Sequence, residues 1–424
     1  MSKLLYAIDF GTSNSLMAAA SVDQIHPLIP LDPMASDPTV MRTLIYFENQ
    51  KSVYFGNEAI SHFVANSLEG RFLRSVKRFL PVKSFEGTQV FGRFRKLEDL
   101  IGCFLSEMRR RANLHYGQEV DSVILGRPAL FSEEAELDRL AQSRLEAAAK
   151  IAGFKHIEFL AEPVAAAYRF QQEMKKEEIV LVADFGGGTS DYTLLKLSPQ
   201  EFKPQDVLAI GGAPIAGDAL DGQIMRHRIT RSFGSETRYQ VPFGSNILQM
   251  PKALMGHLCS TAYINLLNSA ENREFLRQMK SWSLQETETQ KIMQLEILLE
   301  NQLGFSVFEA IEAAKVEISK SKKGAVSFHY PGIDIEEKIS EPQFQEYTQD
   351  ERAKIFSALD ETMIRANLKP SQIDRVCCTG GTAKVTSIRN ELAKRFGESR
   401  IESFRQFTSI VEGLAARGKQ VLNS

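Results

Sequence analysis

Two short segments of the sequence combine an aspartate, a glycine turn and a hydroxyl residue. They are AIDFGTSNS at residues 7–15 and VADFGGGTSD at residues 182–191, and an apolar run precedes each glycine turn. A glycine-rich turn after a strand exposes successive backbone N–H groups, which bind anionic oxygens. Glycine also lets a phosphate approach the backbone closely. The two segments therefore predict a pair of phosphate-binding turns.

The side chains of these segments further predict a metal-binding site and hydroxyl hydrogen-bond donors. Asp9 and Asp184 stand at the predicted strand ends, and the turns carry Thr12 or Ser13 and Thr189 as hydroxyls. Because Mg²⁺ takes few carboxylates together with waters and phosphate oxygens, one aspartate on each side of a phosphate chain suits this cation. Neither turn fits the P-loop pattern GxxxxGK[ST]. Neither fits a Rossmann fingerprint, since the glycines lead into a second strand rather than a helix.

Two further charged residues could act on a phosphate, although each alone has an ordinary explanation. Glu162, in FLAEPVAAAY, stands at the end of a predicted strand and the start of a helix, where a carboxylate can face a water or a metal. Taken alone, Glu162 is better explained as an ordinary acid at a helix N-terminus. Lys77, in SVKRFLP, is one of many lysines and would by itself be a surface charge.

A helix predicted over residues 306–323 and a late glycine turn could hold a nucleoside. Glu312, Lys315 and Ser319 fall at i, i+3 and i+7, on one face of that helix. This face is either a solvated stripe of charges or a polar surface for a ribose and base. Gly380 and Gly381 follow a predicted strand in CTGGTAK, where a flat ring could pack against the backbone.

The elements that position these residues repeat in the two halves of the chain. Residues 1–20 are predicted to form a strand, a glycine turn and a second strand. The same pattern recurs from residue 178, which predicts two similar lobes. Between them we expect strands over residues 42–55, a helix over 97–116 and a buried strand that ends at Pro128. A second helix is expected from an N-cap at Ser132 to a stop at Gly153.

The second half is expected to contain a long helical region before the sheet resumes. Residues 220–322 are poor in strand signals. Ser306 and Glu309 form an S-x-x-E capping box, and Gly324 is expected to end that helix. A strand at residues 375–378, a helix from about Ile388 and a final helix near the end complete the chain.

Composition narrows the class of protein. Hydrophobic residues make up 43% of the 424 residues, and 51 basic residues nearly balance 53 acidic ones, so no nucleic-acid partner is indicated. The four cysteines form no CxxC pair, and two of them, Cys377 and Cys378, suit a buried strand. No apolar run approaches the length of a membrane span. We expect no signal peptide, because Asp9 interrupts the short apolar stretch of the first residues. A cytoplasmic location without membrane contact is expected.

Taken together, the motifs resemble the actin-like ATPase superfamily and, within it, the nucleotide-binding domain of DnaK-type heat-shock chaperones. The segments that carry the resemblance are IDFGTSNS, VKRF, LAEPVAAAY, ADFGGGTSDYTLL, EAAKVEIS and CTGGTAK, in the family's order. The resemblance implies an α/β actin-like ATPase fold with two similar lobes, duplicated ribonuclease-H-like βββαβα units, around a nucleotide cleft. Lobe I would be residues 1–175 and lobe II residues 176–424, with a largely helical subdomain at about 220–330.

The resemblance also implies roles for single residues, with ATP or ADP and Mg²⁺ as ligands. The metal shell would be held by Asp9 and Asp184. The catalytic residues would be Lys77, Glu162, Asp184 and Thr189. The phosphates and the adenosine would be bound by Gly11, Thr12, Ser13, Gly186, Gly187, Gly188, Gly217, Glu312, Lys315, Ser319, Gly380, Gly381 and Lys384. Asp191 would serve either the metal site or only the second strand.

The sequence departs from the family pattern at several positions. Val316 replaces the arginine that stacks on adenine, which would weaken affinity or relax base choice. In AGDALD, Ala216 and Ala219 replace a glycine and an aspartate of the family motif, which puts its phosphate and metal contacts in doubt. Arg127 alters the family's V-P-A-Y-F segment, whereas Pro128, part of its interlobe switch, is present.

The resemblance leads to an expected function and to alternatives from other classes. Since few residues follow Gly381 and their end, FTSIVEGLA, resembles a shorter YegD-like branch of putative chaperones, we expect no peptide-binding domain. The leading expectation is a slow, Mg²⁺-dependent ATPase whose lobes close on nucleotide and change the surface offered to a protein partner or co-chaperone. The alternatives are a filament-forming actin-like ATPase, a nucleotide sensor without hydrolysis and a small-molecule kinase.

Overall fold

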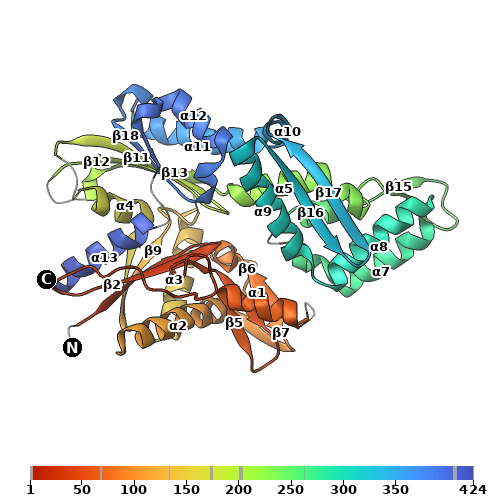
Figure 1. Cartoon of the computed structure of the whole chain (residues 1–424), viewed down its shortest axis with the longest axis horizontal. Coiled ribbons are helices and arrows are strands. Elements are labelled where there is room, and N and C mark those ends of the chain that lie inside the picture. The colour runs from red at the N-terminus through yellow and green to blue at the C-terminus, as the bar shows by residue number, and fades with distance from the viewer. Residues whose placement is uncertain are drawn as a thin grey trace.

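Two five-stranded sheets with the same topology organise the molecule (Figure 1). The computed structural model describes residues 3–66, 69–132, 134–171, 175–199, 204–261, 263–403 and 408–423. The first sheet has the order β10-β9-β1-β2-β3 and the second β13-β12-β11-β18-β19. In chain order, the first three strands of each sheet are antiparallel neighbours. The fourth strand pairs in parallel with the first, and the fifth pairs in parallel with the fourth. The predicted duplication is confirmed, and each βββαβα unit continues with a further strand and helix.

The elements of the first half form the first sheet, its covering helices and two small sheets. The main strands are β1 (Leu5–Phe10), β2 (Asn14–Ala20), β3 (Met41–Arg42), β9 (Ser122–Arg127) and β10 (His156–Ala161). The small strands are β4 (Leu44–Phe47), β5 (Val53–Phe55), β6 (Arg71–Arg74), β7 (Gly87–Val90) and β8 (Arg93–Lys96). The helices are α1 (Gly56–Ala65), a 3₁₀ helix (Val76–Phe79), α2 (Leu97–Tyr116), α3 (Ala135–Ile151) and α4 (Glu162–Gln171).

The elements of the second half form the second sheet and an arm. The main strands are β11 (Glu178–Phe185), β12 (Ser190–Leu197), β13 (Val207–Ala213), β18 (Arg375–Thr379) and β19 (Ile401–Ser403). The helices of this half outside the arm are α10 (Glu341–Tyr347), α11 (Gln349–Arg365), a 3₁₀ helix (Gly381–Lys384), α12 (Thr386–Phe396) and the last helix, α13 (Thr408–Asn423). The arm contains α5 (Gly217–Ile224), a π-helix (Met225–Ile229), β14 (Arg238–Gln240), β15 (Ile247–Gln249), α6 (Lys252–Leu258), α7 (Ala270–Trp282), α8 (Glu286–Glu300), α9 (Gly304–Ser321), β16 (Lys323–Tyr330) and β17 (Ile333–Ser340).

Strand β1 is apolar along its whole length because helices cover both faces of its sheet. Tyr6, Ile8 and Phe10 pack in one buried cluster, which includes residues of α2 and α3. Leu5 and Ala7 point to the opposite face and pack against α13. A strand buried on both faces reads as a continuous hydrophobic run, which is why the two phosphate-turn strands were recognisable from sequence.

Two helices cross between the sheets and connect the lobes (Figure 1). Ala165 of α4 packs with α13 against the first sheet, whereas its neighbour Ala166 packs against β11 and β12 of the second. Gly413 of α13 lies so close to α4 that an added Cβ would be 1.7 Å from the Ala165 carbonyl oxygen. The last helix of the chain therefore packs on the sheet of the first half, although lobe II was predicted to run through residue 424.

Three predicted helix boundaries were wrong. Helix α3 has Glu134 as its N-cap rather than Ser132, whose hydroxyl accepts the Glu134 N–H at 3.2 Å. Helix α9 begins at Gly304, so Ser306 lies inside its first turn and forms no capping box. That helix ends with Lys322 in the left-handed conformation, and the glycine expected to stop it belongs to β16. Helix propensity and caps fix such ends only to within a turn.

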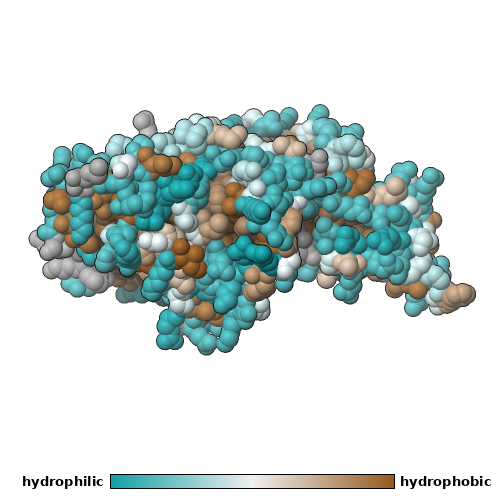
Figure 2. Space-filling view, turned by 90° about the horizontal axis from the view of Figure 1, so that it is seen from below, coloured by the Kyte–Doolittle hydropathy of each residue, from teal (hydrophilic) through white to brown (hydrophobic). Residues whose placement is uncertain are grey.

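The helical region predicted over residues 220–322 is the arm that projects to the right in Figure 1. It also contains the β14–β15 hairpin, which the sequence did not indicate. Seen from below, the surface is mostly hydrophilic, with apolar residues in scattered patches (Figure 2). Within the described ranges, no helix has the length and apolar character needed to cross a membrane.

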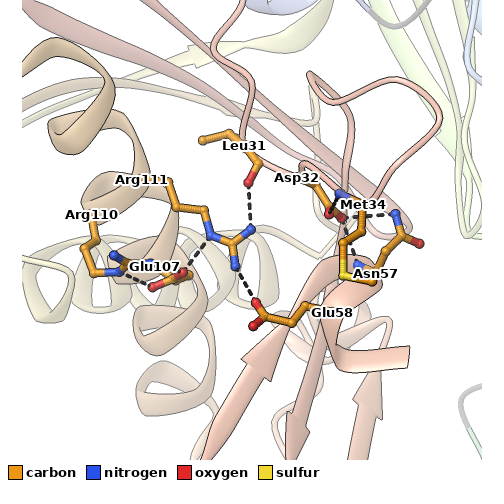
Figure 3. Close-up of polar contacts among 8 residues, drawn as sticks. All are labelled: Leu31, Asp32, Met34, Asn57, Glu58, Glu107, Arg110 and Arg111. Atoms are coloured by element: carbon orange, nitrogen blue, oxygen red, sulfur yellow. Dashed lines mark hydrogen bonds and ion pairs between the residues drawn. The ribbon is translucent and has the colours of Figure 1, made fainter. Parts of the chain in front are cut away.

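A polar cluster in the first half attaches the long loop before β3 to α1 and α2 (Figure 3). The Arg111 guanidinium donates to the Leu31 carbonyl oxygen at 2.7 Å, to Glu107 at 2.6 Å and to Glu58 at 3.1 Å. The fully buried Asp32 accepts hydrogen bonds from the Asn57 backbone and side-chain amides at 2.8 and 3.1 Å. One arginine thus joins three segments that are far apart in sequence.

Arg111→Ala should lower the free energy of unfolding by about 2 kcal/mol, because it leaves a shielded carbonyl and Glu107 with fewer donors. Urea unfolding measures this change. Arg110→Ala is the matched control, since Arg110 is 59% exposed and pairs with the same glutamate. An equal loss in both variants would contradict the role assigned to Arg111.

Candidate functional site

The first glycine turn joins β1 to β2. Thr43, the residue after β3, holds this turn by two hydrogen bonds. The Thr43 backbone N–H donates to the Ser13 carbonyl oxygen at 2.9 Å, and the Thr43 hydroxyl donates to the Gly11 carbonyl oxygen at 2.9 Å. The carbonyls of the turn are thus held by the protein. Gly11, Thr12 and Ser13 all line a cleft of about 410 Å³ between the lobes.

The second glycine turn joins β11 to β12 and faces the first across the cleft. An added Cβ on Gly187 would lie 2.5 Å from Ser13 Oγ, so the two turns are in direct contact range. The Gly186 carbonyl accepts from the Thr382 hydroxyl at 2.8 Å, and the Gly187 carbonyl accepts from the Asp218 N–H at 2.7 Å. Two strand–turn–strand units from opposite sheets therefore converge on one point, as the repeated motif predicted.

A buried ion pair lies in the same cleft as the two predicted metal-binding aspartates. Lys77 Nζ is 2.9 Å from Glu162 Oε1, and both side chains are about nine-tenths buried. Lys77 comes from the 3₁₀ helix and Glu162 from the start of α4. Asp9 and Asp184 line the same cleft, and Asp184 Oδ1 accepts from the Thr379 hydroxyl at 2.7 Å.

The carboxylates outnumber the ammonium in this part of the cleft, and their pKa values reflect it. Burial and the charge of Glu162 raise the pKa of Asp9 well above its usual range. The same two causes, partly offset by the Thr379 hydrogen bond, raise the pKa of Asp184 to about 6. Although burial opposes it, the charges of Glu162 and Asp9 hold the pKa of Lys77 above its usual value. Burial and mutual repulsion therefore destabilise the ionised forms of these carboxyl groups.

Asp191 lies on β12 behind the second turn. It accepts the Thr189 hydroxyl at 2.8 Å, and burial together with the Asp184 charge raises its pKa to about 8. It is absent from the residues that line the cleft, whereas Thr189 lines it. Asp191 thus holds a cleft hydroxyl rather than facing the cleft itself.

Helix α9 contributes the opposite end of the cleft. Glu312 and Lys315 line it, together with Val316 and Lys320. Lys315 Nζ lies 2.8 Å from Asp221 Oδ2, and Asp221 Oδ1 is buried without a hydrogen-bond partner in the described chain. Burial raises the pKa of Asp221 to about 6 despite this ion pair. A donor from a bound ligand would satisfy that oxygen.

Gly380 needs to be glycine for two physical reasons. Its φ of +83° lies in the left-handed region, and an added Cβ would be 2.1 Å from the Phe185 carbonyl oxygen and 2.9 Å from Asp184 Oδ1. Gly381 and Lys384 follow in a 3₁₀ helix and line the cleft. The Gly-Gly turn thus brings its backbone next to the strand that carries Asp184.

Most of the residues predicted from sequence do meet in one cleft. Its lining includes Asp9, Gly11, Thr12, Ser13, Lys77, Glu162, Asp184, Gly186, Gly187, Thr189, Gly217, Glu312, Lys315, Gly380, Gly381 and Lys384. Two predicted residues lie outside it. Gly188 lines a neighbouring cavity, and the Ser319 hydroxyl donates to the Lys315 carbonyl oxygen at 3.0 Å within α9.

Several residues of the cleft had not been singled out from sequence. Asp218 and Asp221 lie in AGDALD, a segment recognised only as a poor match to the family motif. Ser75 precedes the Lys77 turn and has a left-handed φ of 56°, which no local pattern indicates. Arg42 and Phe305 reach the cleft from different lobes, so only tertiary structure could find them.

Comparison with known proteins identifies the family. Residues 84–252 and 273–423 match the sequence profile of the family described as "Hsp70 protein". The chain belongs to the Hsp70 family. The fold is therefore the actin-like ATPase fold, consistent with the two sheets of identical strand order. The predicted resemblance to DnaK-type chaperones is confirmed.

Similar Hsp70 proteins are distant in sequence. The chain is 23% identical over 398 residues to "Chaperone protein DnaK" of Thermosipho melanesiensis, covering 92% of this chain and 55% of that protein. It is 28% identical over 268 residues to "Chaperone protein HscA" of Buchnera aphidicola, covering 59% and 42%. It is 22% identical over 434 residues to the DnaK of Deinococcus deserti, covering 97% and 58%. The chain spans about half the length of the curated relatives it matches.

Gly380→Ala should destabilise the Hsp70 fold by several kcal/mol, because the new Cβ would overlap the Phe185 carbonyl and force β11 away from β18. Urea unfolding checks this. Gly397→Ala is the matched control: its φ is +91°, but no atom lies within 4 Å of the added Cβ, so only about 1 kcal/mol of backbone strain is expected. Equal losses would mean that strain alone matters at Gly380.

Proposed function

We propose that this Hsp70 chain binds ATP with Mg²⁺ in the interlobe cleft and hydrolyses it slowly to ADP and phosphate. The observation that carries the proposal is the contact of the two glycine turns, with Gly187 against Ser13 and the Lys77–Glu162 pair beside them. Backbone N–H groups from both turns would bind the β- and γ-phosphates from opposite sides. The Lys77 ammonium would offset the charge that develops on the transferring phosphoryl group.

Mg²⁺ fits the donor set of the cleft. In the described residues there is no group of three or more His, Cys, Asp or Glu side chains that could hold a metal alone. A cation that takes two carboxylates, waters and phosphate oxygens needs no such group. Asp9 and Asp184 would hold it, and their raised pKa values support the fit, since a cation would relieve the excess negative charge. When bound, Mg²⁺ would neutralise phosphate charge.

Hydrolysis requires a water molecule aligned with the γ-phosphate. Its oxygen would bond to the γ-phosphorus, the bond to the bridging oxygen of ADP would break, and the water would lose a proton. Asp184 would orient this water and accept its proton, because its carboxylate lines the cleft together with the glycine turn that would bind the γ-phosphate. Glu162, fixed by Lys77, would position the water or the metal shell. The Thr189 hydroxyl, which donates to Asp191 in this structure, would turn its proton to the γ-phosphate.

The nucleoside would occupy the end formed by α9 and the Gly-Gly turn. The unpartnered Asp221 Oδ1 and the Glu312 carboxylate are acceptors for a ribose or a base amino group. Val316 replaces the family arginine and is 44% exposed, so no guanidinium at this position stacks on the base. We therefore expect weaker discrimination among purine bases than a stacking arginine would give.

Contacts between the lobes at the mouth of the cleft support closure on nucleotide. Phe305 of α9 is 5% exposed and packs in a cluster of residues from lobe I, with its ring 4.8 Å from that of Phe72. The Arg74 guanidinium lies 5.4 Å from the centre of the Phe305 ring, and Arg42 forms a 2.5 Å ion pair with Glu309. A ligand bound by both lobes would add to these contacts, and closure would change the surface offered to a protein partner.

Lys77→Ala should slow ATP hydrolysis by roughly 100-fold or more while changing nucleotide affinity by less than about tenfold, because the ammonium acts mainly on transition-state charge. Single-turnover phosphate production measures the first effect. The rise in melting temperature with Mg-ATP measures the second.

Lys83→Ala is the matched control, since this lysine is 75% exposed and pairs with an exposed glutamate. A loss of binding alone in Lys77→Ala would refute the role of Lys77. Wild-type protein that binds Mg-ATP without producing phosphate would instead indicate a nucleotide sensor, and ATP-dependent pelleting would indicate a filament. Phosphate transfer to an added sugar or alcohol would indicate a kinase.

Phe305→Ala should speed nucleotide release by about tenfold or more, because it removes a buried aromatic contact between the lobes. Stopped-flow release of a fluorescent ATP analogue measures the rate. Phe94→Ala removes a phenylalanine of the β7–β8 hairpin that is 51% exposed and lies outside the buried cluster around Phe305, so release should not change. Unaltered release from Phe305→Ala would refute a closing role for this contact.

A further inference from the structure

A second cavity of about 240 Å³ lies behind the second glycine turn. It is lined by Arg78, Gly188, Pro214, Asp218, Ala219, Gly222, Gln223, Arg226, Gly256, Cys259, Ser260, Thr261 and Glu351. Arg78 comes from lobe I, and all the other lining residues come from lobe II. None of the residues assigned to nucleotide binding lines this cavity except Gly188.

Only a thin wall separates this cavity from the nucleotide cleft. Asp218 is the one residue that lines both. Its carboxylate is held by Arg78 at 3.3 Å and by the Thr261 hydroxyl at 3.1 Å. The rest of the wall is the turn itself: an added Cβ on Gly187 would be 3.1 Å from Asp218 Oδ1, and one on Gly188 would be 3.3 Å from the Arg78 side chain. The wall is thus made of glycine backbone and one interlobe ion pair.

Two consecutive residues of the 3₁₀ helix Val76–Phe79 line the nucleotide cleft and the second cavity, respectively. Lys77 lines the nucleotide cleft, and Arg78 lines the second cavity. Because Arg78 and Asp218 belong to different lobes, their ion pair breaks when the lobes separate. The side chains are 30% and 11% exposed, and such a partly solvated pair is weak enough to open and close with lobe movement.

The polar groups of the cavity suit a small anion that also carries a proton. Arg226 is exposed and forms no ion pair with any described residue, so a second guanidinium is free for an anion. Glu351 Oε1 accepts from Gln223 at 2.6 Å, whereas Glu351 Oε2 is buried without a partner and needs a donor. Burial raises the pKa of the Cys259 thiol to about 11, so it adds no negative charge.

We propose that this second cavity binds inorganic phosphate and receives it after ATP hydrolysis, when the Arg78–Asp218 pair opens. The proposal rests on the proposed function for the source of the phosphate. Orthophosphate near neutral pH offers acceptor oxygens for the two arginines and a P–OH group that can donate to Glu351 Oε2. Its size fits a 240 Å³ space, whereas a nucleotide would require the 410 Å³ cleft.

The test is a calorimetric titration of inorganic phosphate into the full chain without nucleotide. Arg226→Ala should weaken phosphate binding by about tenfold, because it removes a charge-assisted donor. Arg231→Ala is the matched control: this arginine lies five residues further on, is 67% exposed and pairs with Glu236. Phosphate affinity should be the same in Arg231→Ala and wild type. Sulfate, which carries no proton at this pH, should bind more weakly than phosphate.

Two more variants distinguish the cavity from the cleft. Lys77→Ala should retain phosphate binding if the ion sits in the second cavity and lose it if the ion sits in the cleft. Glu351→Gln, which replaces an acceptor-only carboxylate, should reduce the preference for phosphate over sulfate. Circular dichroism of each variant checks its fold, and the Glu351 result stands if Arg226→Ala does not fold.

Failure of this proposal and failure of the proposed function give different results. Phosphate binding that depends on Arg226 in a chain that never hydrolyses ATP would keep the anion site and refute the ATPase. Hydrolysis together with phosphate binding that is lost in Lys77→Ala and unchanged in Arg226→Ala would keep the ATPase and overturn the second site. No phosphate binding at millimolar concentration would also overturn it.

Discussion

The close approach of two glycine turns from opposite sheets is the constraint on which the rest of the structure depends. An added Cβ on Gly187 would lie 2.5 Å from Ser13 Oγ, so the turns that follow β1 and β11 meet at one point. The identical order of the two sheets makes this possible, since in each the strand before the turn is central and buried on both faces. Any ligand between the turns is contacted by both halves of the chain.

Where the two turns converge, the acidic side chains outnumber the basic ones. Asp9, Glu162 and Asp184 share one ammonium, that of Lys77, in a space shielded from water. Burial makes each unpaired carboxylate costly, which is expressed as raised pKa values. A cation placed among these carboxylates would relieve their mutual repulsion.

The lobes are connected by helices of one half that pack on the sheet of the other, as well as by side-chain contacts. Helix α13 ends the chain but packs on the first sheet, and α4 carries Ala165 toward one sheet and Ala166 toward the other. Rotation about this crossing would move the mouth of the cleft, where Phe305 and Arg42 meet the opposite lobe. The Arg78–Asp218 pair also joins the two lobes, so the same rotation would alter it.

The sequence by itself determined the two glycine turns, the duplication and most cleft residues, because these depend on local requirements: glycine for close backbone approach, an aspartate at a strand end, a continuous apolar strand. It predicted Lys77 and Glu162 only through resemblance, since single charges carry no local signal. Tertiary structure decided which charged side chains form ion pairs with one another. Glu309 looked like a helix cap and instead reaches Arg42, while Asp218 and Arg78, 140 positions apart, meet between two cavities. Such contacts arise from the packing of whole lobes, which no short stretch of sequence encodes.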